Sequence, residues 1–299
     1  MRNKGKITTE LELVGTLKML AEAYEEVSVL KMQKVRGSVL ATREFLDGLG
    51  GIFVDVKKNY GQKIERMIDR KKMAPHATFS TRSHNGKTLI VFLSANSKFY
   101  GDIVRRVFEV FLADVKKKDA DILIIGKSGK EMMDQSGFKK EYNYLELGDT
   151  QVGLEDLRPI IEKLVEYEKV DVYYGRFSNM VNQLPTIANV SGQGILESQA
   201  EVKVEEVKET VTPYAFEPSV EKILDFFESQ VFISLFKQTV NESELARLAS
   251  RIRAMEEALG NIERLEPKIK REGRIMNKAM QNKKQIEVMT SVYFLRNQI

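Results

Sequence analysis

The stretch LARLASRIRAMEEALGNIERLEPKIKREGRIMNKAM, residues 245–280, decides the fold of this 299-residue chain. Its apolar side chains recur at alternating intervals of three and four residues, the spacing of a coiled-coil seam. The seam positions are Leu245, Leu248, Ile252, Met255, Leu259, Ile262, Glu266, Ile269, Gly273, Met276 and Met280. The stretch therefore predicts a long helix that packs against another helix along one narrow face.

The helical pattern around this stretch starts at Glu217-Pro218 and meets no strong stop before Ile299. Such a helix would be about 125 Å long at 1.5 Å per residue, too long to be buried along its whole length in a chain of this size. Part of it must protrude, pair with a second helix or enter a partner. Pro267 lies inside the pattern and predicts a kink or a local break.

A second helix is predicted at the other end of the chain, from about Thr8 to Lys58. Its first apolar row has the spacing of a seam, and after a break of five residues a second row follows. The first row is Leu13, Leu17, Leu20, Tyr24 and Val27; the second is Met32, Val35, Val39, Thr42, Leu46, Leu49, Phe53 and Val56. The two terminal helices are expected to wind around each other.

The middle of the chain alternates strand and helix patterns, which predicts a small α/β domain with a mostly parallel sheet. Strands are expected at residues 88–95, 121–126 and 170–174, and helices at residues 99–118 and 154–169. The polar residues 191–212 are expected to form a loop with an edge strand near residues 202–211.

Composition excludes several classes of site. The chain has no cysteine, so disulfides, thiolate nucleophiles and cysteine-based metal sites are absent. The histidines His76 and His84 lie in one polar stretch without a carboxylate cluster, so neither is expected to bind a metal. No stretch has the roughly 20 apolar residues of a membrane span, and no apolar leader segment opens the sequence. The net charge of +4 does not by itself indicate nucleic-acid binding.

One short segment resembles a phosphate-binding loop. Gly126-Lys-Ser-Gly-Lys130 follows a strand, but the first glycine of the full G-x-x-x-x-G-K-[ST] motif is missing. We interpret it as an ordinary turn between a strand and a helix. The chain also contains no G-x-G-x-x-G and no recognisable catalytic triad, so no cofactor and no catalytic residue is predicted.

Basic residues crowd into one part of the C-terminal helix. They are Lys268, Lys270, Arg271, Arg274, Lys278, Lys283 and Lys284. Either this is a solvated helix face, or it is a positive collar that meets acidic loops of a partner. Nucleic acid is the weaker alternative because no aromatic residues are interleaved.

With these features, the chain resembles the gamma subunit of F-type ATP synthases from end to end. Residues 173–186 are similar to a strand followed by F-x-x-x-x-x-Q-x-P, with Phe177, Gln183 and Pro185 in place. Residues 214–219 resemble the Y-x-x-E-P-S segment that opens the family's C-terminal helix. Further matches to the family's two helices are Arg251, Ala254, Met255, Ala258 and Asn261, and, in the first helix, Ala23, Val27, Lys31 and Met32.

Two segments depart from the family. Its D-R-G-L-C-G-G loop is replaced by Ala95-Asn-Ser-Lys-Phe-Tyr-Gly101. Its N-K-x-R-Q box has a partial counterpart in residues 277–281, but an ungapped alignment, which keeps the heptad spacing continuous, places residues 274–278 there instead.

The resemblance implies an α/β fold class in which the two terminal helices form an antiparallel coiled coil, attached to a small Rossmann-like domain. The implied domains are residues 1–58, 59–213 and 214–299. It implies a non-catalytic central rotor stalk at the cytoplasmic face of the membrane, in contact with the alpha/beta catalytic ring, a small epsilon-type subunit and the membrane rotor ring.

The implied contacts with the catalytic ring are Lys31, Met32, Arg251, Met255 and the seven basic residues of the collar. Two alternatives stay open: a gamma-derived structural adaptor in another assembly, and a small nucleotide-binding enzyme built on the α/β domain.

Overall fold

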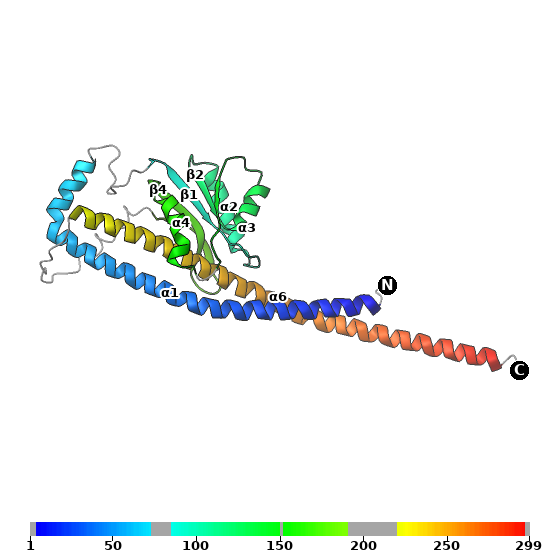
Figure 1. The fold of residues 1–299 in the computed structure, drawn as a ribbon. Helices are drawn as coiled ribbons and strands as arrows, with labels where there is room; N and C mark the ends of the chain where they lie inside the picture. Colours follow the sequence, from blue (N-terminus) through cyan, green and yellow to red (C-terminus); the bar gives the residue numbers. More distant parts are fainter. Residues whose placement is uncertain (1–3, 73–84, 150–151, 191–219, 297–299) are drawn as a thin grey trace. The chain divides into compact units, whose positions relative to one another are not determined.

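The computed structural model describes residues 4–72, 85–149, 152–190 and 220–296. They contain two very long helices, α1 (Lys4–Lys72) and α6 (Val220–Arg296), and an α/β domain between them in sequence (Figure 1). The chain divides into two compact units: residues 1–29 with 251–299, and residues 30–250. The predicted edge strand near residues 202–211 lies outside the described residues.

The α/β domain is built on one five-stranded sheet in the order β3-β2-β1-β4-β5. Its strands are β1 (Thr88–Leu93), β2 (Asp121–Ile125), β3 (Asn143–Leu145), β4 (Lys169–Phe177) and β5 (Gln183–Asn189). All pairs are parallel except β4 with β5. The mostly parallel sheet is therefore confirmed, while β3 and β5 were not predicted.

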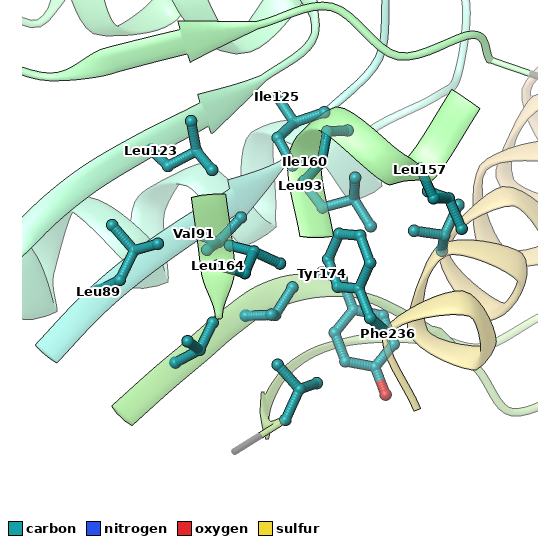
Figure 2. Packing of buried hydrophobic residues seen from close by; sticks show 14 of the residues in the cluster. Leu89, Val91, Leu93, Leu123, Ile125, Leu157, Ile160, Leu164, Tyr174 and Phe236 are labelled. Carbon is teal, nitrogen blue, oxygen red and sulfur yellow. The ribbon is translucent and has the colours of Figure 1, made fainter. Parts of the chain in front are cut away.

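Helices cover both faces of the sheet, so its central strands are continuous apolar runs. On one face lie α2 (Ile103–Val115) and α3 (Lys127–Gln135), which pack against the sheet through Phe108, Phe111 and Met133. On the other face, α4 (Leu154–Leu164) and the first part of α6 meet the sheet. Figure 2 shows Leu157, Ile160 and Leu164 of α4 beside Tyr174 of β4 and Phe236 of α6.

In the first compact unit, α1 and α6 run antiparallel and form a coiled coil. Near one end, Tyr24 stacks under the guanidinium of Arg251, 5.4 Å from its ring centroid. Near the other end, a Cβ built on Gly273 would lie 3.3 Å from Cγ2 of Ile7. Moving backwards along α1 thus means moving forwards along α6, which confirms the predicted antiparallel pairing.

The predicted seam of α6 is confirmed as far as Met276. All its positions from Leu245 to Met276 are buried or half-buried, including Glu266 and Gly273, whereas Met280 is exposed. The helix also runs through Pro267 without a break, so the predicted local break is wrong. Pro267 is exposed, and the carbonyl that loses its hydrogen bond there can be solvated, which lets the helix continue.

The predicted seam of α1 is wrong in its first part. Leu13, Leu17 and Leu20 are exposed by 46–57%, and the buried positions lie one residue further along. The true seam repeats every seven residues without interruption, so the predicted break after Val27 does not exist. The buried positions seven residues apart are Ile7, Val14, Ala21, Ser28, Val35, Thr42 and Leu49, and Val39 and Leu46 are buried between the last of them.

The error has a physical cause. Between Val14 and Met32 the seam of α1 holds Lys18, Ala21, Glu25 and Ser28, which are small or charged, while the large apolar residues stand beside it. Small side chains let two helices approach closely, so the seam need not coincide with the most apolar row. The helix also ends later than predicted, at Lys72 instead of Lys58. The division into domains at residues 58 and 213 stays a prediction.

Gly101 is required where the loop after β1 meets α6. Its φ is +61°, and a Cβ there would lie 2.8 Å from the carbonyl oxygen of Ser250. Replacing Gly101 with alanine is expected to lower the free energy of unfolding by about 2–3 kcal/mol, because backbone strain and overlap add.

Gly86 provides a matched control for this substitution. Its φ is +69°, but nothing lies within 4 Å of the added Cβ, so Gly86→Ala is expected to cost only about 1 kcal/mol. Urea unfolding of both variants measures the difference, and equal losses would show that contact with Ser250 is unimportant.

Candidate functional site

The basic collar of α6 lies on the surface, and most of it shares one helix face. At about 100° per residue, Lys268, Lys270, Arg271, Arg274 and Lys278 fall within an arc of about 160°, centred roughly opposite the seam. All five side chains are exposed. We call these five residues the basic face.

Two predicted members of the collar do not belong to this face. Lys283 and Lys284 are exposed as well, but the helix geometry turns them toward the side on which the seam would continue. Lys283 forms a 4.0 Å ion pair with Glu287 on its own helix. The structure therefore separates the seven predicted basic residues into a face of five and a pair.

Charge also reaches into the seam. Glu266, at a seam position, forms an ion pair with Lys270 of the basic face. The hydrogen bond and charge of Lys270, together with the charge of Lys18 on α1, hold the pKa of Glu266 below its ordinary value. A polar residue at a seam position favours one alignment of the two helices over others. Glu266 therefore helps to fix the register of α1 against α6.

The last part of α6 is uncovered by any other described residue. Every position from 277 to 293 is exposed, a length of about 25 Å at 1.5 Å per residue. Large apolar side chains stand out along it, namely Ile286, Val288, Met289, Val292 and Tyr293, each exposed by more than half. Exposed apolar side chains in such number mark an interaction surface. We call residues 277–293 the tip.

The other four predicted contact residues are partly or wholly covered within the chain. Met32 is half-buried and packs beside Val35 and Leu248, and Lys31 is half-buried next to it. Arg251 is only 4% exposed and stacks on Tyr24, and Met255 lies in the seam. These side chains shape the coiled coil, whereas the basic face and the tip are free to meet a partner.

The apolar row of α1 whose spacing predicts a seam forms an exposed surface instead. It consists of Leu13, Leu17, Leu20, Tyr24 and Val27, all exposed by 39–57%. We call it the outer row. The first compact unit thus presents three surfaces of different character: the outer row on α1, the basic face on α6 and the apolar tip.

The segment that resembles a phosphate loop is an ordinary strand-to-helix turn. The N–H groups that would cradle a phosphate already donate to the loop after β1: Lys127 to the Asn96 side chain, Ser128 to the Ala95 carbonyl and Gly129 to the Ser94 hydroxyl. These bonds leave no N–H of the turn's first residues for a nucleotide.

A polar cluster at the carboxyl ends of the strands, half-buried at Asp149 and buried at Arg247, was not predicted. The Asp149 carboxylate accepts the backbone N–H groups of Asn96 and Ser97, and Arg247 of α6 lies within the same cluster. Burial would raise the pKa of Asp149, but hydrogen bonds from Ser97 and Asn96 and the Arg247 charge hold it below its ordinary value. The participants come from distant parts of the sequence, so no local pattern reveals them.

The described part of the chain offers little else to chemistry. It contains no group of three or more histidine, aspartate or glutamate residues arranged to hold a metal ion. His76 and His84 lie outside the described residues. Within the described residues, no helix is long and apolar enough to cross a bilayer.

Comparison with known proteins agrees with this architecture. The sequence model of the family described as ATP synthase matches residues 3–289. The ATP synthase gamma chain of Mycoplasma mobile is 23% identical over 272 residues, covering 89% of each chain. The ATP synthase gamma chain of Roseiflexus sp. is 25% identical over 278 residues, again covering 89% of each.

Solved structures share the fold. A chain of the central stalk and c-ring structure of the Tetrahymena thermophila mitochondrial ATP synthase has a TM-score of 0.55 at 17% identity, covering 80% of this chain and 99% of that one. A chain of the Euglena gracilis mitochondrial ATP synthase structure has a TM-score of 0.53 at 15% identity, covering 88% and 94%. The family match, the two long terminal helices and the mostly parallel sheet all agree with these relatives. The chain belongs to the family of ATP synthase gamma chains.

Proposed function

We propose that this chain is the central rotor stalk of an F-type ATP synthase and couples rotation of a membrane ring to ATP synthesis or hydrolysis in a catalytic ring. The observation that carries the proposal is the antiparallel coiled coil whose α6 continues past its last seam contact, Met276, as an uncovered tip. The family match over residues 3–289 supports the same conclusion.

The proposed mechanism depends on the different surfaces that the coiled coil presents on its different sides. The basic face and the outer row differ in charge and polarity and lie on different helices. A shaft with such surfaces presents a different side to each catalytic site around it. Each site is then biased toward a different conformation by its own differential contacts, and turning the shaft moves that bias from site to site.

We assign the contacts with the catalytic ring as follows. The basic face meets acidic loops of the ring by electrostatic complementarity, and the apolar tip enters the middle of the ring. Lys31, Met32, Arg251 and Met255 contribute by holding the coiled coil in shape, and Lys283 and Lys284 extend the positive charge into the tip. In this view the coiled-coil parts, residues 1–58 and 214–299, form the shaft.

The α/β domain, residues 59–213, forms the foot in this proposal and meets a small epsilon-type subunit and the membrane rotor ring. The chain itself performs no catalysis, and it reaches the cytoplasmic face of the membrane through these partners. The absence of catalysis in this proposal is supported by the carboxyl edge of the sheet, where a nucleotide would otherwise bind. There the backbone N–H groups already donate to side chains of the chain itself.

The test is co-purification followed by an ATPase assay. A tagged copy of the chain is expected to bring down the catalytic ring subunits of the same cell, and the ring with the chain is expected to hydrolyse ATP at a different rate from the ring alone. Recovery of another assembly in place of the ring would favour the structural adaptor. Binding of ATP or NAD by the isolated chain in calorimetry would favour the enzyme.

A further inference from the structure

The carboxyl ends of β1, β2 and β3 lie at the edge where sheets of this type bind ligands. In this chain the edge is occupied by its own side chains. The Asp149 carboxylate accepts the N–H of Asn96 at 2.7 Å and that of Ser97 at 2.6 Å. A carboxylate therefore stands where two adjacent N–H groups could otherwise have bound an anion.

The same edge is joined to the long helix by one arginine. Arg247 of α6 donates from one terminal nitrogen to the Ser94 carbonyl at 2.7 Å and to the Ser243 hydroxyl at 3.1 Å. Its other terminal nitrogen lies 3.4 Å from the Asp149 carbonyl. One planar guanidinium thus holds the end of β1, the segment after β3 and the helix together.

Aromatic and backbone contacts tighten the joint. The guanidinium lies over the Tyr100 ring, 5.7 Å from its centroid, and Tyr100 is itself buried. One turn further along α6, Gly101 packs directly on the Ser250 backbone. The loop after β1 therefore touches α6 at consecutive turns of the helix.

Arg247 is poorly explained as a source of stability alone. It is only 4% exposed, and its Nε has no hydrogen-bond partner among the described residues. Burying a charge with an unmade hydrogen bond is costly, and an apolar side chain of the same size often packs as well or better. What the fork of the guanidinium provides is geometric definition, since it fixes three segments in one arrangement.

We propose that Arg247 is a positioning residue that locks the α/β domain to α6, so that the sheet and the helix turn as one body. This role rests on the proposed function as a rotor stalk. It makes Arg247, with its anchors at Ser94 and Asp149, the point at which load passes between the foot and the shaft.

The test compares Arg247→Met with Arg247→Lys in the assembled complex reconstituted into vesicles. Arg247→Met is expected to keep ATP hydrolysis within twofold of wild type, while proton pumping per ATP falls at least threefold. Arg247→Lys keeps one donor for the Ser94 carbonyl, so it is expected to restore part of the ratio. A pumping ratio of wild-type size in Arg247→Met would overturn the proposal.

Phe236→Leu is the control for simple destabilisation. Phe236 is fully buried between α6 and the sheet and takes no part in the polar joint. Phe236→Leu is expected to lower the melting temperature by at least as much as Arg247→Met but to leave the pumping ratio unchanged. If the ratio falls equally in both variants, Arg247 acts only through packing and the proposal is wrong.

Hydrogen exchange on the isolated chain separates this proposal from the proposed function. In Arg247→Met, the amides of Asn96 and Ser97 are expected to exchange at least tenfold faster, while those of β1 keep their rates. Failure of the wild-type chain to assemble with the ring contradicts the rotor-stalk function and leaves this exchange result intact. Unchanged exchange at Asn96 and Ser97 contradicts the joint itself.

Discussion

Replacing Val14 with aspartate is expected to separate α1 from α6 in the first compact unit, whereas the same change at Leu13 is expected to leave them paired. Val14 is 5% exposed and packs in one cluster with Ile7, Ile262 and Ile269. A carboxylate there would lose its hydration among apolar side chains, and Lys18 one turn further along α1 offsets only part of that loss, so the expected cost is about 3 kcal/mol. Leu13 is 57% exposed, and its substitution is expected to change stability by about 0.5 kcal/mol or less.

Two measurements on this pair of variants give different information. Circular dichroism during urea unfolding reports the pairing of α1 with α6. The coiled coil is expected to unfold in a first transition at low urea, and only Val14→Asp is expected to lose that transition. Co-purification with the catalytic ring tests whether the outer row contacts the ring. Leu13→Asp is expected to reduce the amount of ring recovered although the chain stays folded. If Leu13→Asp destabilised the chain as strongly as Val14→Asp, the seam described above would be in the wrong register.

Reversing the charge of the basic face is expected to have the second large effect. Glutamate at Lys268, Lys270, Arg271, Arg274 and Lys278 replaces five exposed cations that we assign to acidic loops of the ring. Exposed ion pairs contribute about 0.2–1 kcal/mol each, so losing five weakens association by roughly tenfold or more. ATP-driven proton pumping by the reconstituted complex is expected to fall with it.

A matched control reverses exposed lysines of the α/β domain, Lys116, Lys117 and Lys139. This variant shifts the net charge in the same direction but leaves α6 untouched, and it is expected to assemble with the catalytic ring as the wild-type chain does. Higher salt is expected to narrow the difference in assembly between wild type and the basic-face variant, because exposed charges are screened. Coupled activity of wild-type size in the basic-face variant would remove that face from the mechanism.

The seam of α6 could be predicted from sequence because most of the large apolar residues between positions 245 and 280 stand at seam positions, Leu265 and Ile275 being the exposed exceptions. Leu245, Ile252, Ile262 and Ile269 all stand at buried positions. In α1 the two sets differ, since Ala21 and Ser28 are buried while Leu17 and Leu20 are exposed. Hydrophobicity alone selects the wrong row there. An unbroken heptad from Ile7 through Val35 to Leu49 was the better guide, because a supercoil winds most evenly around a continuous repeat.

The sheet was predicted where its strands are buried on both faces and missed at its edges. β1 and β2 are short, continuous apolar runs, which sequence reveals directly. β5 contains Pro185, and only its first residue, Gln183, is buried, so it lacks the apolar run or the strict alternation by which a strand is recognised. β3 has only three residues and carries too little sequence to be recognised.

The basic collar was predicted as a cluster, but its division into a face of five and a separate pair follows only from the helix and its seam. The Arg247 joint could not have been predicted, because Ser94, Asp149 and Arg247 meet only after the sheet and α6 have packed. Long-range polar contacts of this kind leave no periodic signal in a single sequence.

The central claim is that this chain turns inside a catalytic ring, and rotation can be measured directly. The chain has no cysteine, so Lys139→Cys, on the exposed surface of the α/β domain, gives a single attachment point for a bead. With the ring fixed to a surface and MgATP supplied, the account predicts sustained rotation of the bead in one direction. ATP hydrolysis by the same immobilised complexes without any directed rotation would contradict it.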